Sequence, residues 1–165
     1  MSSQQVDLSS YVSKADSYAL NVDSAFPMEN LYNSDERSEL RSDADDQLIV
    51  HFAFTEKVKL TGLNVVAPRN ERRPEHIKLF TNQVSVGFED IESLPAAFEM
   101  DVEGDDVTEG KMIPLRMVKF NNIDSVTLFV ESSEGGDIAA LSSVKFFGQA
   151  IQGTNMSELK KTPGA

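Results

Sequence analysis

The chain has 165 residues, of which 15 are basic and 27 acidic, so its formal net charge is −12, and it contains no cysteine. This length suits a single domain, which can bury about 70% of its unfolded surface. The lack of cysteine excludes disulfides, thiol catalysis and thiolate metal sites, and the negative charge argues against nucleic acid as a partner because it repels phosphate backbones.

The N-terminal segment, MSSQQVDLSS, has neither the basic patch nor the apolar stretch of a secretory signal. No apolar run approaches the roughly 18 residues that are needed to cross a bilayer. We therefore expect a soluble protein without a membrane partner, located in the cytoplasm, with the nucleus as a further compartment.

Residues 1–36 predict a partly helical N-terminal arm that packs on the rest of the domain. A second helical turn is predicted from Met28 to Tyr32, directly after Pro27. The first helical stretch is indicated by apolar residues at spacings of three and four, which is the helical period: Leu8, Tyr11, Val12, Ala15, Tyr18 and Ala19.

From Gln47 onward the apolar period changes to two, which predicts a strand with one strongly apolar face. Polar turns separate several further short apolar runs, and no long helical pattern alternates with them. Residues 37–165 therefore predict an all-β, antiparallel β-sandwich rather than an α/β sheet. The further strands are expected at 58–66, 77–81, 98–102, 115–120, 126–131 and 144–147.

Two further segments lie in the last third of the chain. The stretch PLRMVKFNNIDSVTLFVES, residues 114–132, is either a pair of consecutive antiparallel strands or a corner that passes between two sheets. The tail predicts a final helical turn over 156–161. Glu158 follows Asn155 by three residues, which is similar to a capping box.

Several segments of this chain, in the same order, resemble the PITH domain, the proteasome-interacting thioredoxin module. The segments are LRSDADDQLIVHFAF (40–54), VKLTGLNVVAP (58–68), IKLFTN (77–82), IPLRMVKFNNIDSVTLFVES (113–132) and FFGQAIQGTNMSELKK (146–161). The resemblance implies a jelly-roll-like β-sandwich and a non-enzymatic role, namely docking on the regulatory particle of the 26S proteasome.

The chain departs from the two-domain members of that family in one respect. It has no thioredoxin domain, and without cysteine a C-x-x-C redox site is impossible here. The chain is therefore either a natural solitary module or a fragment of a longer protein, and no redox function is carried over.

Two sets of residues are candidate partner-binding sites. The loop APRNERRPE carries a basic island of Arg69, Arg72 and Arg73, and arginine in a loop on a rigid sandwich favours docking. The alternative is a charged loop that balances local acidity. The second set is a short stripe in the tail, which consists of Met156, Leu159, Lys160 and Lys161. This stripe could bind a groove of a partner, or it could pack back on the domain's own sheet.

No catalytic residue, cofactor or metal site is predicted. His51 and His76 are expected to be ordinary histidines, with His51 on an outer sheet face, because no nucleophile signature accompanies them. Two acidic clusters are interpreted as solvated loops rather than calcium sites; they are Asp43, Asp45 and Asp46, and Asp101, Glu103, Asp105 and Asp106.

These observations predict a monomeric, non-enzymatic protein-interaction module, and the resemblance to the PITH domain implies that it docks on the 26S proteasome regulatory particle. The alternative is a β-sandwich module that binds carbohydrate or another ligand. Sugar-binding faces usually offer flat aromatic side chains, and this chain contains no tryptophan, which argues against the alternative without excluding it.

Overall fold

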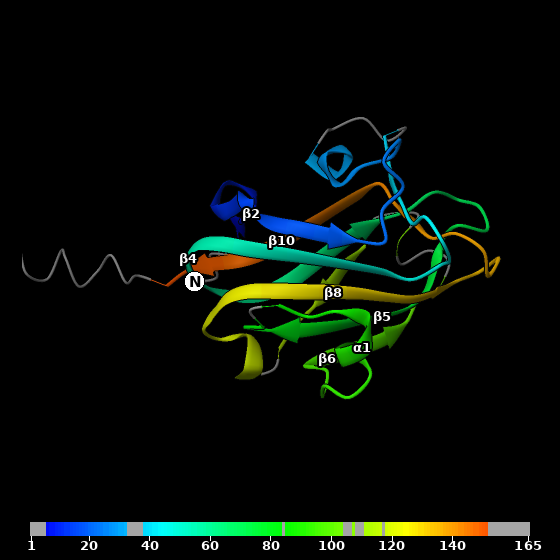
Figure 1. Cartoon of the computed structure of the whole chain (residues 1–165). Helices are drawn as coiled ribbons and strands as arrows, with labels where there is room; N and C mark the ends of the chain where they lie inside the picture. The colour runs from blue at the N-terminus through cyan, green and yellow to red at the C-terminus, as the bar shows by residue number, and fades with distance from the viewer. Residues whose placement is uncertain are drawn as a thin grey trace, which may run out of the picture.

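The computed structural model describes residues 6–32, 38–83, 85–103, 107, 111–116 and 118–151. The strands in these ranges pair antiparallel and stack as two layers around a shared core (Figure 1). This arrangement is a jelly-roll-like β-sandwich, which confirms the predicted fold class. Within the same ranges, no helix is long and apolar enough to cross a membrane.

The long strand β4 (Leu48–Val66) belongs to both layers. Its first half pairs with β2 (Val12–Leu20) and β8 (Ile123–Ser133). Its second half pairs with β10 (Ser143–Ala150) and β7 (Met112–Pro114). In Figure 1, β4 bends sharply in its middle and its second half runs back toward the opposite end of the molecule. A single strand therefore links the two layers covalently.

The remaining elements extend or cover these layers. In the first layer β8 pairs with β5 (Pro74–Thr81), and β5 pairs with β6 (Phe98–Asp101). In the second layer β1 (Val6–Asp7) pairs with β10. A separate two-stranded sheet joins β3 (Leu40–Arg41) to β9 (Ala140–Leu141). The short helical elements are η1 (Ser9–Tyr11), η2 (Met28–Tyr32), α1 (Phe88–Ile91) and η3 (Val118–Phe120).

The core lies between the two layers and is built from alternating residues of their strands. The ring of Phe146 on β10 contacts the rings of Phe52 and Phe54 on β4 edge-on, at centroid distances of 5.1 and 5.8 Å. Such pairs contribute about 0.5–1.5 kcal/mol beyond the area that they bury. The predicted strands at 77–81, 98–102, 126–131 and 144–147 all fall within this framework, and the predicted turn at 28–32 is η2.

The outer face of the first layer is also covered, by the segment that contains α1. Ile91 of this segment packs with Ile49 of β4, Phe80 of β5 and Phe129 of β8 in a second apolar cluster. The first half of β4 is therefore buried on both faces, and this explains its continuous apolar run, because a strand covered on both sides has no solvent face to mark with polar residues.

The predicted helix over residues 8–19 is wrong, because most of this stretch is the edge strand β2. Ser13 pairs with Ala53, but the next pair is Tyr18 with His51, so β2 carries extra unpaired residues. The hydroxyl of Ser17 fills the interruption: it donates to the Ser13 carbonyl and accepts from the Ala53 amide, at 2.7 and 3.0 Å. The inserted residues break the period of two, so the apolar positions mimic a helical spacing.

The predicted strand over residues 115–120 is also wrong. Its last residues form η3, in which Phe120 is fully buried while Val118 is 82% exposed. β7 lies in the second layer and β8 in the first. The stretch 114–132 is thus the corner between sheets, and not a pair of consecutive strands that bond to each other.

A β-bulge interrupts the pairing of β4 with β10. Phe147 pairs with Gly62 and Gly148 with Leu60, so Thr61 is the extra residue on β4. Opposite the bulge the two backbones approach so closely that a Cβ atom on Gly148 would lie 1.9 Å from the Lys59 carbonyl oxygen. Only glycine fits at this position without moving one of the strands.

Replacing Gly148 with alanine should therefore destabilise the domain by about 1–3 kcal/mol, the usual cost of forcing extra atoms into packed backbone. Urea unfolding followed by circular dichroism measures this change. The exposed neighbour Gln149 provides the control, since Gln149→Ala should change the free energy of unfolding by less than about 0.5 kcal/mol. Equal effects of the two substitutions would contradict the close approach at Gly148.

Candidate interaction surfaces

Two of the three arginines in the predicted docking loop are bound within the molecule. Nε of Arg72 lies 3.3 Å from Oε2 of Glu39, a buried carboxylate that Arg41 also contacts. The guanidinium of Arg73 lies 3.1 Å from a carboxylate oxygen of Glu134. These arginines therefore fix the loop to its neighbours, as does the backbone bond from the Gly135 amide to the Glu71 carbonyl, at 2.8 Å.

The third arginine of the island, Arg69, is exposed to solvent. It forms no ion pair with any residue in the described part of the chain. Arg69 is thus the member of the island that is available to a partner. The tail residues Met156, Leu159, Lys160 and Lys161 lie outside the described residues, so their docking role stays a prediction.

Arg72→Ala should lower the free energy of unfolding by about 1–3 kcal/mol, because it removes one of the two cations beside the buried Glu39 carboxylate. Arg69→Ala should change it by less than about 0.5 kcal/mol. Chemical denaturation of the two variants in parallel checks the difference. If both were neutral, the structural role of Arg72 would be refuted. Arg69 alone is therefore the right position for charge reversal in a binding assay, because changing Arg72 also perturbs the fold.

His51 lies on the sheet face opposite Phe52, as expected, but it is buried there. Its ring stacks on Tyr18 of β2 at a centroid distance of 4.8 Å, and its Nδ1 lies 2.9 Å from the hydroxyl of Thr127. Burial lowers the pKa of His51 below the usual value, although the charge of Asp124 acts in the opposite direction. The buried position of His51 on the outer face of the first layer thus favours the neutral form of its ring.

His76 on β5 lies among three carboxylates of neighbouring strands. Its Nδ1 lies 2.7 Å from Asp101 and its Nε2 lies 2.9 Å from Glu99 of β6, while Glu131 of β8 is 3.7 Å from Nε2. Partial burial lowers the pKa of His76, but the bonds to the two β6 carboxylates and the charge of Glu131 outweigh it, so the pKa is raised. The cluster is a charged face that favours the protonated form of His76, and the contacts of the ring include no nucleophile for the histidine to activate.

The two histidines should therefore titrate on opposite sides of the unperturbed value of about 6.5. Side-chain NMR titration of the wild type should place the pKa of His76 above this value and that of His51 below it. Because the folded pKa of His76 is raised, its stabilising contribution is present below pH ~6.5 and is lost as the pH rises through the folded pKa. His76→Gln should then lose most stability relative to wild type at the acidic end of this range. Two histidines with the same pKa would contradict the geometry.

The acidic clusters are engaged within the fold where the structure describes them. Asp45 accepts bonds from the Asn21 side chain and the Gln47 amide, at 2.9 and 3.1 Å, and Asp46 accepts one from the Ser133 amide, at 2.8 Å. Asp105 and Asp106 lie outside the described residues. Among the residues that are described, no group of three or more His, Cys, Asp or Glu side chains is arranged so that it could hold a metal ion, the His76 cluster included.

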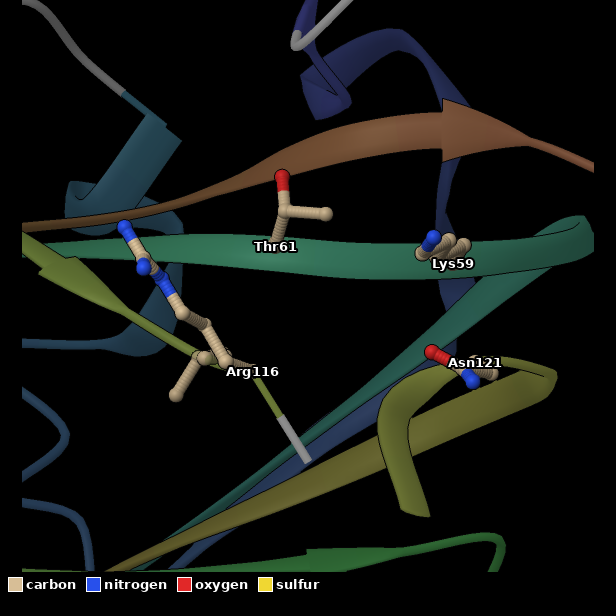
Figure 2. A pocket seen from close by; sticks show the side chains of 5 residues that line it. Lys59, Thr61, Arg116 and Asn121 are labelled. Carbon is tan, nitrogen blue, oxygen red and sulfur yellow. The ribbon is translucent and has the colours of Figure 1, made fainter. Parts of the chain in front are cut away.

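A pocket of about 320 Å³ opens beside the second half of β4 (Figure 2). Three segments build its walls. Lys59 and the bulged Thr61 project from β4, Leu115 and Arg116 follow β7, and Asn121 follows η3. The Leu115 amide donates to the Thr61 carbonyl at 3.0 Å, which holds the segment after β7 against β4.

The chemistry of this pocket is cationic and polar. Leu115 is 1% exposed, whereas Lys59, Arg116 and Asn121 are open to solvent. None of its five lining residues is acidic or aromatic. Sequence reasoning missed the pocket because Lys59 and Arg116 are far apart along the chain. One signal was present: residues 111–123, KMIPLRMVKFNNI, carry three cations and no carboxylate in an otherwise acidic chain.

A two-layer sandwich with a shared apolar core and a small polar pocket is typical of a binding module. The comparison with family models makes the assignment specific. The PITH domain model matches residues 1–164, and this chain therefore belongs to the PITH domain family.

Curated relatives agree with this assignment. The chain is 31% identical over 147 residues to thioredoxin-like protein 1 of Schizosaccharomyces pombe, covering 86% of this chain and 51% of that protein. It is 33% identical over 105 residues to a PITH domain-containing protein of Caenorhabditis elegans, covering 62% of this chain and 49% of the relative. The chain thus spans about half the length of the curated relatives that it matches.

Solved structures with the same fold include carbohydrate-binding modules. The family 32 module of Clostridium perfringens NanJ, solved in complex with galactose, aligns with a TM-score of 0.65 at 9% identity, over 87% of this chain and 98% of that one. A family 32 module from a family 31 glycoside hydrolase of the same organism aligns with a TM-score of 0.59 at 16% identity, over 86% and 97%. At these identities the likeness shows the fold alone.

Proposed function

We propose that this chain is a non-enzymatic protein-interaction module that docks on the regulatory particle of the 26S proteasome. Membership of the PITH family supports the proposal most, because the family resemblance implies this docking role. The proposed module acts in the cytoplasm and the nucleus. It binds its partner as a monomer.

The distribution of surface chemistry is consistent with this role. The faces of the first layer are covered, one by the core and the other by the α1 segment, so recognition on that layer is left to its rims and corners, where loops on a rigid scaffold commonly carry binding residues. Both ring nitrogens of His76 are hydrogen-bonded to carboxylates, and its described contacts include no nucleophile. Such an arrangement supports binding rather than catalysis.

A carbohydrate-binding module is the second candidate, because several proteins with this fold bind sugars, as the galactose complex shows for one of them. Flat aromatic side chains usually stack on sugar rings, and none of the described residues that line the pocket beside β4 is aromatic. The protein-docking proposal therefore has the stronger support.

The wild-type chain should bind purified 26S proteasomes at physiological salt, because the proposed partner is a part of that assembly. Size-exclusion chromatography followed by detection of the co-eluting chain measures the binding. An unrelated β-sandwich domain of similar net charge is the control, since it shares architecture and acidity but not the family's surface.

The proposal would be contradicted if this chain co-eluted with proteasomes at no more than the level of that control. Failure to co-elute together with specific binding on a glycan array would favour the carbohydrate-binding candidate instead.

A further inference from the structure

We propose that the pocket beside β4 binds side-chain carboxylates of an acidic peptide segment in a partner protein, through Lys59 and Arg116. The exposed Val118 next to the pocket contacts an apolar residue of the same segment. This inference rests on the proposed function in one respect, namely that the occupant is a protein.

Lys59 and Arg116 form no ion pair within the described part of the chain, whereas several other cations do. Arg72, Arg73 and Lys57 each lie within 4.0 Å of a carboxylate of this chain. Across the described ranges, no carboxylate lies within that distance of Lys59 or Arg116. Their charges are therefore not neutralised internally, and an external carboxylate is the simplest complement to two unpaired cations that line one pocket.

The segment that supplies Arg116 to the pocket is opposite in charge to the molecule as a whole. The whole chain has a net charge of −12, yet Lys111, Arg116 and Lys119 all fall in a stretch without a single Asp or Glu, and all three are exposed. A basic patch on an acidic protein attracts an acidic segment while the rest of the surface repels it. The orientation of binding is thereby restricted to this corner.

Exposed apolar side chains gather on the same segment. Of the large hydrophobic residues exposed in the described part of the chain, Val118 is 82% exposed and Met112 is 44% exposed, and both flank the pocket residues along the chain. The Asn121 amide donates to the Val118 carbonyl at 3.0 Å, and Phe120 is fully buried. η3 is thus anchored in the core while it holds Val118 out to solvent.

The donors that line the pocket are of the types that bind a carboxylate. The guanidinium of Arg116 can form two parallel bonds to one carboxylate, and Lys59 supplies a second positive charge. Figure 2 shows the two cations projecting from different segments, with Thr61 between them on β4. Because the Leu115–Thr61 backbone bond holds the segment after β7 against β4, the backbone that carries the two cations is positioned before binding, and only their side chains have to be ordered.

The test is a fluorescence anisotropy titration of the full chain with a labelled nine-residue peptide of Asp, Glu and Leu, whose C-terminus is amidated so that only side-chain carboxylates are offered. The double variant Lys59→Glu/Arg116→Glu should weaken binding at least about tenfold, and affinity should fall as salt rises. Lys14→Glu/Lys145→Glu is the matched control: it changes two exposed cations that do not line the pocket by the same total charge and should leave the affinity within about twofold.

Val118→Ser should weaken binding of this peptide but not of a peptide in which Ser replaces Leu, which separates the apolar contact from the charge effect. Amide spectra of each variant establish that the fold is kept. No binding by the wild type, equal binding of a Lys- and Leu-containing peptide, or equal losses in the two double variants would overturn the inference.

The same variants separate this inference from the proposed function. If the wild type and the Lys59→Glu/Arg116→Glu variant co-elute equally with 26S proteasomes, the pocket is not the docking site although the proposed function stands. If the wild type binds the acidic peptide through Lys59 and Arg116 but does not bind proteasomes, the pocket assignment stands and the proteasome proposal fails.

Discussion

The pairing of β4 with four other strands is the constraint on which the rest of the structure depends. Its first half bonds to β2 and β8, and its second half to β10 and β7. The bend between the halves brings Phe52 and Phe54 over Phe146, so the strand that joins the layers also supplies much of the core between them. Both layers and their shared interior therefore form as one cooperative unit.

The same strand creates the position of the pocket. The bulge at Thr61 and the close approach of Gly148 to Lys59 set the backbone of β4 where it meets the segment after β7. That segment then turns the corner into the first layer, buries Phe120 and leaves Arg116 and Val118 outside. A requirement of the fold, the passage between layers, thus places a basic and partly apolar surface on an acidic molecule.

The sequence predicted the sandwich because most strands retain an apolar period of two or a continuous apolar run, as residues 48–54 and 126–131 do. It failed where pairing is irregular. The interruption between Ser13 and Tyr18 gives the apolar residues of β2 a helical spacing. In the corner at 115–120, Phe120 is buried whereas Val118 is exposed, so the apolar residues do not mark one face of a strand. Site residues were harder to predict, because Glu39 and Glu134, the partners of Arg72 and Arg73, come from distant parts of the chain.

The most direct measurement is a structure of this domain bound to the proteasome regulatory particle. The account predicts that carboxylates of the particle lie within about 4 Å of Lys59 and Arg116, with Val118 covered by an apolar side chain. A complex in which the particle contacts only the Arg69 loop or the His76 face, while the pocket beside β4 stays open to solvent, would contradict it.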